Sequence, residues 1–161
     1  MASSAWNVPT EQLVLLETAG SLLRGKDSRV FWVRPEETVY EAIAMMADLG
    51  IGALLVVERG RLAGIVSERD YARKVILRGR SSRQTAVREI MTSPVITITG
   101  EATLEDCMRI VTERRIRHLP VMDGDRIAGM ISIGDLVKAI MSAQADTIRQ
   151  LSSYITGSYP A

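Results

Sequence analysis

The amino-acid sequence predicts an α+β fold built from two β-α-β-β-α repeats related by a pseudo-twofold axis, with flanking N- and C-terminal helices. The first observation is that the chain aligns with itself at a shift of 65 residues, without a gap from Thr38 to Asp70. The second is that each copy passes from helical spacing of apolar residues to two β-branched runs. One copy of about fifty residues would leave a sheet face uncovered, so the two copies are expected to cover each other.

Each copy opens with a short strand and a helix. The helix follows a Thr-x-x-acid sequence, in which the hydroxyl caps the first turn and the carboxylate reaches back to the backbone. Apolar residues then recur at intervals of three and four, as in an amphipathic helix. These elements are expected at 30–33 and after Thr38 in the first copy, and at 95–98 and after Thr103 in the second.

Two apolar runs joined by a reversal come next in each copy, and they indicate a β-hairpin of buried strands. The reversals are Arg59-Gly60 and the segment 123–125. A second helix then starts at a serine. The predicted strands are 53–57, 62–66, 119–122 and 127–131, and the helices start at Ser67 and Ser132.

Two further helices flank the repeats, one near 9–23 and a long one from Asp135 towards Tyr154. Each has an apolar face that could pack on the repeats or on a second subunit. The predicted organisation is an N-terminal helix and lead-in (1–25), a first repeat (26–80), a linker with the second repeat (81–141), and a C-terminal helix and tail (142–161).

Composition excludes several classes of protein. The 161 residues are 47% apolar with a net charge of +1, which indicates no polyanionic partner. No apolar run approaches the length of a membrane span, and no secretory signal is recognised, so a cytoplasmic protein is expected. The single cysteine, Cys107, lies in an apolar helical pattern and is expected to be a core thiol rather than a nucleophile served by His118. No metal site is predicted.

The segments that carry chemistry are 64–70 and 129–135, where a strand ends at a serine and an aspartate follows three residues later. One interpretation is purely structural, because Ser-x-x-Asp caps a helix with about 1 kcal/mol of stabilisation. The other is a binding site, since a helix N-terminus attracts anions and the carboxylate can accept hydrogen bonds from the two hydroxyls of a ribose. Both interpretations stay open on the motif alone.

The loop before the middle strand differs between the copies, with Gly52-Ala53 in the first and Arg117-His118 in the second. The twofold arrangement is expected to bring each loop near the capped helix of the other repeat. Arg117 and His118 suit phosphate, whereas Gly52 permits close backbone approach. A basic stretch at 69–88, with seven Lys or Arg against one acid, is either a phosphate-facing surface or a solvated linker.

Both Gly-x-x-Ser-x-x-Asp segments, together with Arg-His-Leu-Pro-Val at 117–121 and the linker at 87–92, closely resemble the tandem CBS-domain pair, or Bateman module. The resemblance covers about residues 26–140. It implies binding of AMP, ADP, ATP, NAD(H) or S-adenosylmethionine in two symmetry-related clefts between the repeats, a role as an energy or redox sensor in signal transduction, and a homodimer.

By position, the resemblance also implies the residues of each cleft. One cleft would use Ser67, Arg69 and Asp70 with Arg117, His118 and Met91, the other Ser132 and Asp135 with Lys26 and Ala53, and adenine would lie by Ile65 or Met130. Gly134 stands where the first copy has Arg69, so the Asp70 cleft is expected to hold the tighter or more phosphorylated ligand.

The leading hypothesis is therefore a regulatory module that binds adenine nucleotides and is not an enzyme. A small enzyme acting on nucleotides is the first alternative, for which only His118 and Asp70 could serve as acid or base. Weak nucleic-acid binding through the basic stretch is the second, but 4% aromatic residues leave little for base stacking.

Overall fold

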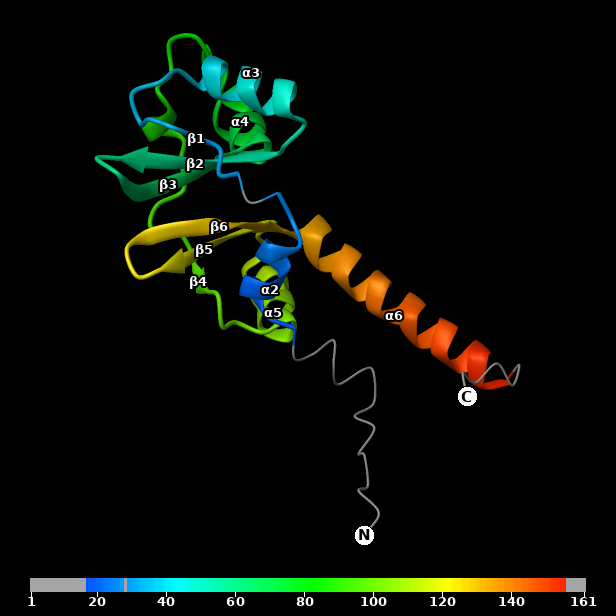
Figure 1. Ribbon diagram of the computed structural model, residues 1–161. Helices are drawn as coiled ribbons and strands as arrows, with labels where there is room; N and C mark the ends of the chain where they lie inside the picture. The colour runs from blue at the N-terminus through cyan, green and yellow to red at the C-terminus, as the bar shows by residue number, and fades with distance from the viewer. Residues whose placement is uncertain (1–16, 28, 156–161) are drawn as a thin grey trace. The chain divides into compact units, whose positions relative to one another are not determined.

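The computed structural model describes residues 17–27 and 29–155. Its contacts divide the chain into two compact units. Of the described residues, unit 1 combines 17–27, 98–119 and 131–155, and unit 2 combines 29–97 and 120–130. Figure 1 shows the order of the elements along the chain by label and colour.

The internal repeat is confirmed by the bounds of the elements, since helices and strands of the second copy lie 65 residues after those of the first. The helix, the middle strand and the hairpin partner recur with the same lengths. The three pairs are α3 (Val39–Leu49) and α5 (Leu104–Arg114), β2 (Ala53–Glu58) and β5 (His118–Asp123), and β3 (Arg61–Ser67) and β6 (Arg126–Ser132).

Each copy contributes a three-stranded sheet, and the orders are β1-β2-β3 and β4-β5-β6. The first strands, β1 (Trp32–Val33) and β4 (Ile98–Thr99), are shorter than the four residues predicted for each. In the first sheet β1 runs parallel to β2, and β2 runs antiparallel to β3. Just before β1, Leu55 N donates one more backbone hydrogen bond to Phe31 O (3.3 Å).

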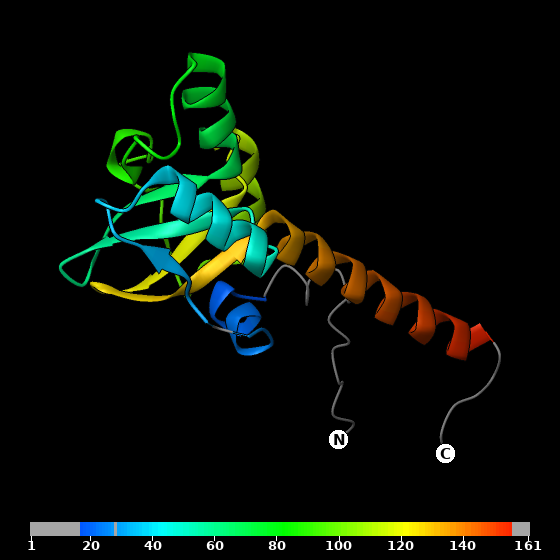
Figure 2. The same cartoon turned by 90° about the horizontal axis from the view of Figure 1, so that it is seen from above.

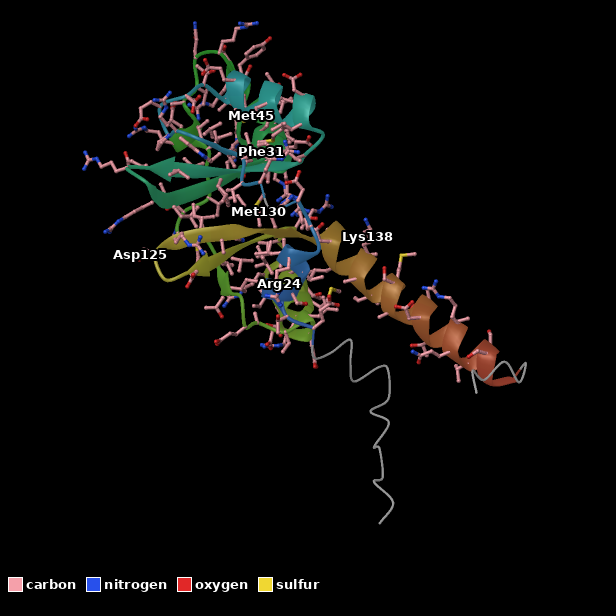
Figure 3. All side chains as sticks on the ribbon, in the orientation of Figure 1. Arg24, Phe31, Met45, Asp125, Met130 and Lys138 are labelled. Carbon is pink, nitrogen blue, oxygen red and sulfur yellow. The ribbon has the colours of Figure 1, made fainter. Side chains whose placement is uncertain are left out.

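The predicted reversal at Arg59-Gly60 is a two-residue hairpin loop, because Glu58 pairs with Arg61. Both loop residues have positive φ, 51° for Arg59 and 76° for Gly60. This conformation matches the right-handed twist of the flanking strands. The corresponding reversal of the second copy carries Gly124 at φ 59°, next to Asp125, which Figure 3 labels at the tip of the hairpin.

The core of unit 2 lies where α3 packs on β2 and β3. Figure 3 labels Phe31 and Met45, which pack against this core from its edge. The helix begins with the predicted capping box, in which Thr38 Oγ1 accepts from Glu41 N (3.1 Å) and Glu41 Oε2 accepts from Thr38 N (2.8 Å). The buried residues of this core are Val33, Val39, Ala42, Met46, Leu54, Val56, Val66, Val75, Val87 and Ile90.

Unit 1 holds the helices α2 (Ala19–Arg24), α5 and α6 (Ile133–Ile155), and α5 contacts α6. Cys107 on α5 is fully buried, which confirms the predicted core thiol. Burial and the neighbouring Asp106 raise the pKa of this thiol, so it is a poor nucleophile. Of the helix predicted near 9–23, the part before residue 17 lies outside the described residues.

The helix that starts after Ser132 and the long final helix are one continuous element, the 23-residue α6. The helix therefore continues without a break across residue 141, where the second repeat was predicted to end and the C-terminal helix to follow. Figures 1 and 2 show α6, coloured orange to red, extending away from α2 of the same unit.

Candidate functional site

The first capped helix, α4 (Glu68–Lys74), begins with a complete capping box. Asp70 Oδ2 accepts from Ser67 N and from Ser67 Oγ, both at 3.0 Å, and Ser67 Oγ accepts from Asp70 N at 3.2 Å. The other oxygen, Oδ1, lies 2.8 Å from Lys74 Nζ. The Asp70 carboxylate is therefore held in one orientation by the helix start, while its second oxygen faces a lysine.

The second capped helix, α6, begins in the same way. Asp135 Oδ2 accepts from Ser132 N (2.8 Å), and Ser132 Oγ accepts from Asp135 N (3.2 Å). Here the lysine comes from the far end of the chain, because Lys26 Nζ lies 2.6 Å from Asp135 Oδ2. Burial raises the pKa of Asp135, but hydrogen bonds from Lys26 and Ser132 outweigh it, so the pKa is lowered overall and the carboxylate is charged near neutral pH.

Each of the two carboxylates thus combines a fixed hydrogen-bonded oxygen with a nearby ammonium group. The arrangement places acceptors for hydroxyl groups beside cations and helix N-terminal amides, which together suit a sugar phosphate. Lys74 belongs to the basic stretch at 69–88, which was predicted to face phosphate or solvent, but it was not paired with Asp70. Its position four residues after Asp70 is a recognisable helical ion-pair spacing that could have indicated it.

The loop before each middle strand is fastened to the capped helix of its own repeat. Glu68 N donates to Gly52 O (3.1 Å), and Ile133 N donates to Arg117 O (2.8 Å). The hairpin register accounts for this contact, because Ala53 pairs with Ser67 and so puts the start of β2 beside the end of β3. The expected position of each loop near the helix of the other repeat stays a prediction. The assignment of Arg117 and His118 to the Asp70 ligand stays a prediction.

His118, the single histidine of the sequence, is half-buried within unit 1. Burial, Lys26 and Arg117 lower its pKa, and Asp135 opposes them. His118 therefore lies in the electrostatic surroundings of three other predicted site residues. Near neutral pH its imidazole is uncharged, so it can act as a hydrogen-bonding group but not as a cation.

The lowered pKa of His118 predicts a pH-dependent stability. The unfolded histidine binds a proton more tightly than the folded one, so protonation destabilises the fold. The stability contributed by the uncharged imidazole is complete above the unfolded pKa of about 6.5 and is lost as the pH falls through the folded pKa. The melting temperature of the chain is expected to fall between pH 7.5 and pH 5.5, in the range where about one histidine per chain titrates. The His118→Asn variant should show a flatter profile over the same range, and an equally steep profile would contradict the assignment.

Gly64 allows the linker to approach strand β3. A side chain at this position would place its Cβ 2.6 Å from Met91 Sδ and 3.1 Å from Thr92 O. The approach is fixed by two backbone hydrogen bonds, Ile65 N to Thr92 O (3.1 Å) and Thr92 N to Ile65 O (2.8 Å). The structure thus brings the predicted residues Ile65 and Met91 together, and it adds Gly64 and Thr92, which the sequence analysis did not assign to the site.

The remaining predicted residues lie on the same elements. Ala53 is buried at the start of β2, and Arg69 follows the Ser67 cap on α4. Met130 lies on β6, where Figure 3 labels it.

Several cations of the basic stretch have structural partners. Arg80 pairs with Glu89 (2.5 Å), Arg88 pairs with Glu36, and the Arg83 guanidinium lies 3.8 Å from the centroid of the Tyr40 ring. These contacts hold the linker to unit 2, which favours the structural interpretation of the stretch outside α4.

Within residues 17–27 and 29–155, no helix has both the length and the apolar character needed to cross a membrane. Over the same described residues, no three His, Cys, Asp or Glu side chains gather in a way that could hold a metal ion.

Comparison with known proteins gives a consistent result. The profile of the CBS domain family matches residues 26–76 and 87–142. A curated relative, the CBS domain-containing protein CBSX3, mitochondrial, of Arabidopsis thaliana, is 39% identical over 154 residues, which are 92% of this chain and 75% of the relative.

Solved structures show the same similarity. A protein with CBS domains from Burkholderia ambifaria MC40-6 is 48% identical, with a TM-score of 0.76 over 78% of this chain and 94% of that chain. A more distant neighbour shares the fold at 20% identity and a TM-score of 0.70, covering 79% of this chain and 98% of that chain: the CBS domain pair of protein MJ0100, solved in complex with 5-methylthioadenosine and S-adenosyl-L-methionine.

Proposed function

Because the chain belongs to the CBS-domain family as a tandem pair, a regulatory nucleotide-binding module, we propose that it binds an adenine nucleotide at the starts of helices α4 and α6. Asp70 and Asp135 would accept hydrogen bonds from the ribose hydroxyls, and the helix N-terminal amides would face the phosphates. The observation that carries the proposal is the recurrence, 65 residues apart, of a capped carboxylate held beside a lysine.

The chemistry of the two sites supports an adenosine-containing ligand. Each carboxylate has a fixed orientation and so can accept from two vicinal hydroxyls without reorganising the helix. The MJ0100 domain pair binds two ligands that contain adenosine, and it shares this fold. AMP, ADP, ATP, NAD(H) and S-adenosylmethionine are the candidates for this chain.

The two sites differ in ways that bear on the ligand. Gly134 follows Ser132 by two residues, where Arg69 follows Ser67, so the α6 site lacks one guanidinium at its helix start. Lys26, in turn, approaches Asp135 from outside the helix. We propose that the Asp70 site prefers the more highly phosphorylated nucleotide.

The full proposal comprises a set of binding residues and a biological role. The role is a cytoplasmic energy or redox sensor in signal transduction, acting as a homodimer, with the two repeats at 26–80 and 81–141. The mitochondrial label of CBSX3 belongs to that relative. The proposed binding residues are Lys26, Ala53, Ile65, Ser67, Arg69, Asp70, Met91, Arg117, His118, Met130, Ser132 and Asp135.

Calorimetric titration of the whole chain tests the proposal directly. AMP, ATP, NADH and S-adenosylmethionine are titrated separately, and at least one is expected to give a saturable heat. The expected dissociation constant is in the micromolar range, which is a binding free energy of about −8 kcal/mol. Inosine monophosphate serves as a matched control, since it keeps ribose and phosphate but replaces adenine. Flat heats for all four adenine compounds would overturn the proposal.

A sensor also returns its ligand unchanged, so no catalytic role is proposed. Incubation of the chain with the bound nucleotide, followed by chromatography of the small molecules, should recover the starting compound. Appearance of a product in proportion to protein would instead support the enzyme alternative.

A further inference from the structure

Helix α6 has two apolar faces, and only one of them is buried. Leu136 is fully buried on the first face, Ile140 and Ala143 on the same face are half-buried, and α6 contacts α5. The second face is exposed along most of the helix, and Met141 and Ile148 are each 63% exposed. We call this second face the α6 stripe, made of Val137, Met141, Ile148 and Leu151.

The spacing of the α6 stripe is that of a helix that pairs with another helix. With Gln144 included, the positions advance by four, three, four and three residues, a seven-residue repeat. A single helix packed on a globular core does not need this second seam. In the heptad, Ile148 takes the first core position and Leu151 the second, a combination that favours two-stranded pairing.

The charges of α6 favour a second copy of the same helix as the partner. The helix carries two acidic residues, Asp135 and Asp146, and two basic residues, Lys138 and Arg149. Asp146 and Arg149 pair with each other on the helix. Two copies therefore meet without net repulsion, whereas a strongly charged partner would find no complementary row of charges.

Gln144 adds a reason for self-pairing. It is the one polar residue among the five positions of the seam and lies at their centre. A lone polar residue in such a seam is stabilised when a partner offers an amide that can both donate and accept. A second copy brings an identical amide to the same interface.

We propose that the α6 stripe is the surface through which two copies of this chain associate, helix α6 against helix α6. This pairing is a property of the helix and requires no ligand. It gives the proposed homodimer a defined interface.

Sedimentation equilibrium of the full chain without nucleotide, over a series of micromolar concentrations, tests the pairing. The unchanged chain is expected to reach the mass of a dimer. Ile148→Glu places a charge in the seam and is expected to raise the dimer dissociation constant at least about tenfold, because a charge buried without a partner is strongly unfavourable.

Ser142→Glu is the matched control, since it adds the same charge to an exposed position on another face of α6. It is expected to leave the dimer unchanged, and circular dichroism of both variants checks that the helix is intact. A monomeric unchanged chain would overturn the proposal, and so would a dimer that Ile148→Glu and Ser142→Glu affect equally.

Discussion

Replacing Asp70 by alanine is expected to lower the affinity of the α4 site for its nucleotide by about a hundredfold, because hydrogen bonds to a charged acceptor contribute about 1.5–3 kcal/mol each. The chain should still unfold cooperatively, since the lost cap costs only about 1 kcal/mol. Calorimetry with the nucleotide that gives the largest heat, beside thermal melting, measures the two effects separately. Unchanged affinity would show that Asp70 is only a helix cap.

The chain supplies its own control for this experiment. Glu41 closes the same kind of capping box on α3 of the same unit, with Thr38 as its partner. Glu41→Ala should therefore lose a similar amount of stability and keep full affinity. Asp135→Ala and Asp106→Ala form the equivalent pair in unit 1, since Asp106 closes the box at the start of α5. A loss of affinity in both members of a pair would point to a general effect of uncapping.

Replacing Gly64 by alanine is expected to destabilise the fold by about 1–3 kcal/mol, as for other overpacked positions. The new Cβ would meet Met91 Sδ at 2.6 Å and the Thr92 carbonyl oxygen at 3.1 Å. The Met91 side chain can rotate away, but the Thr92 backbone is held by its hydrogen bonds to Ile65. The strain therefore falls on the hydrogen bonds between Ile65 and Thr92. The midpoint of urea denaturation, at unchanged slope, measures the loss.

Gly25→Ala is the control, because its Cβ would meet only carbonyl oxygens at 3.8 Å or more. This variant should be stable within about 0.5 kcal/mol of the unchanged chain. If Gly64→Ala also fell within that range, the close approach of the linker to β3 would not matter for folding.

Most of the secondary structure follows from the sequence because it depends on local patterns. The Thr38 and Ser67 boxes start helices α3 and α4 at the predicted residues, since a cap acts within one turn. The hairpin at Arg59-Gly60 likewise needs only its two strands and its loop. The strands before the helices were overpredicted, because their length depends on a neighbouring strand distant in sequence.

The candidate site could be predicted only in part, for the same reason. The aspartates were found because their motif is local, whereas Lys26 was assigned to Asp135 through the family resemblance. No rule of spacing connects two residues 109 positions apart. The contact between the Arg117 loop and the capped helix of its own repeat follows from the hairpin register, and its expected position beside the other repeat stays a prediction. Met91 lies against Gly64 on β3, and this close approach depends on packing that the sequence does not encode locally.

The continuity of α6 has a mechanical consequence. A helix of 23 residues is about 35 Å long, so a tilt of about 5° at its first turn displaces its far end by about 3 Å. The aspartate proposed to hold the ribose lies in that first turn, and the seam proposed to bind a second copy runs from Val137, two residues later, to Leu151 near the far end. One rigid helix would therefore couple the two sites. If bound nucleotide changes the affinity of two copies for each other by some factor, dimer formation must change the affinity for the nucleotide by the same factor.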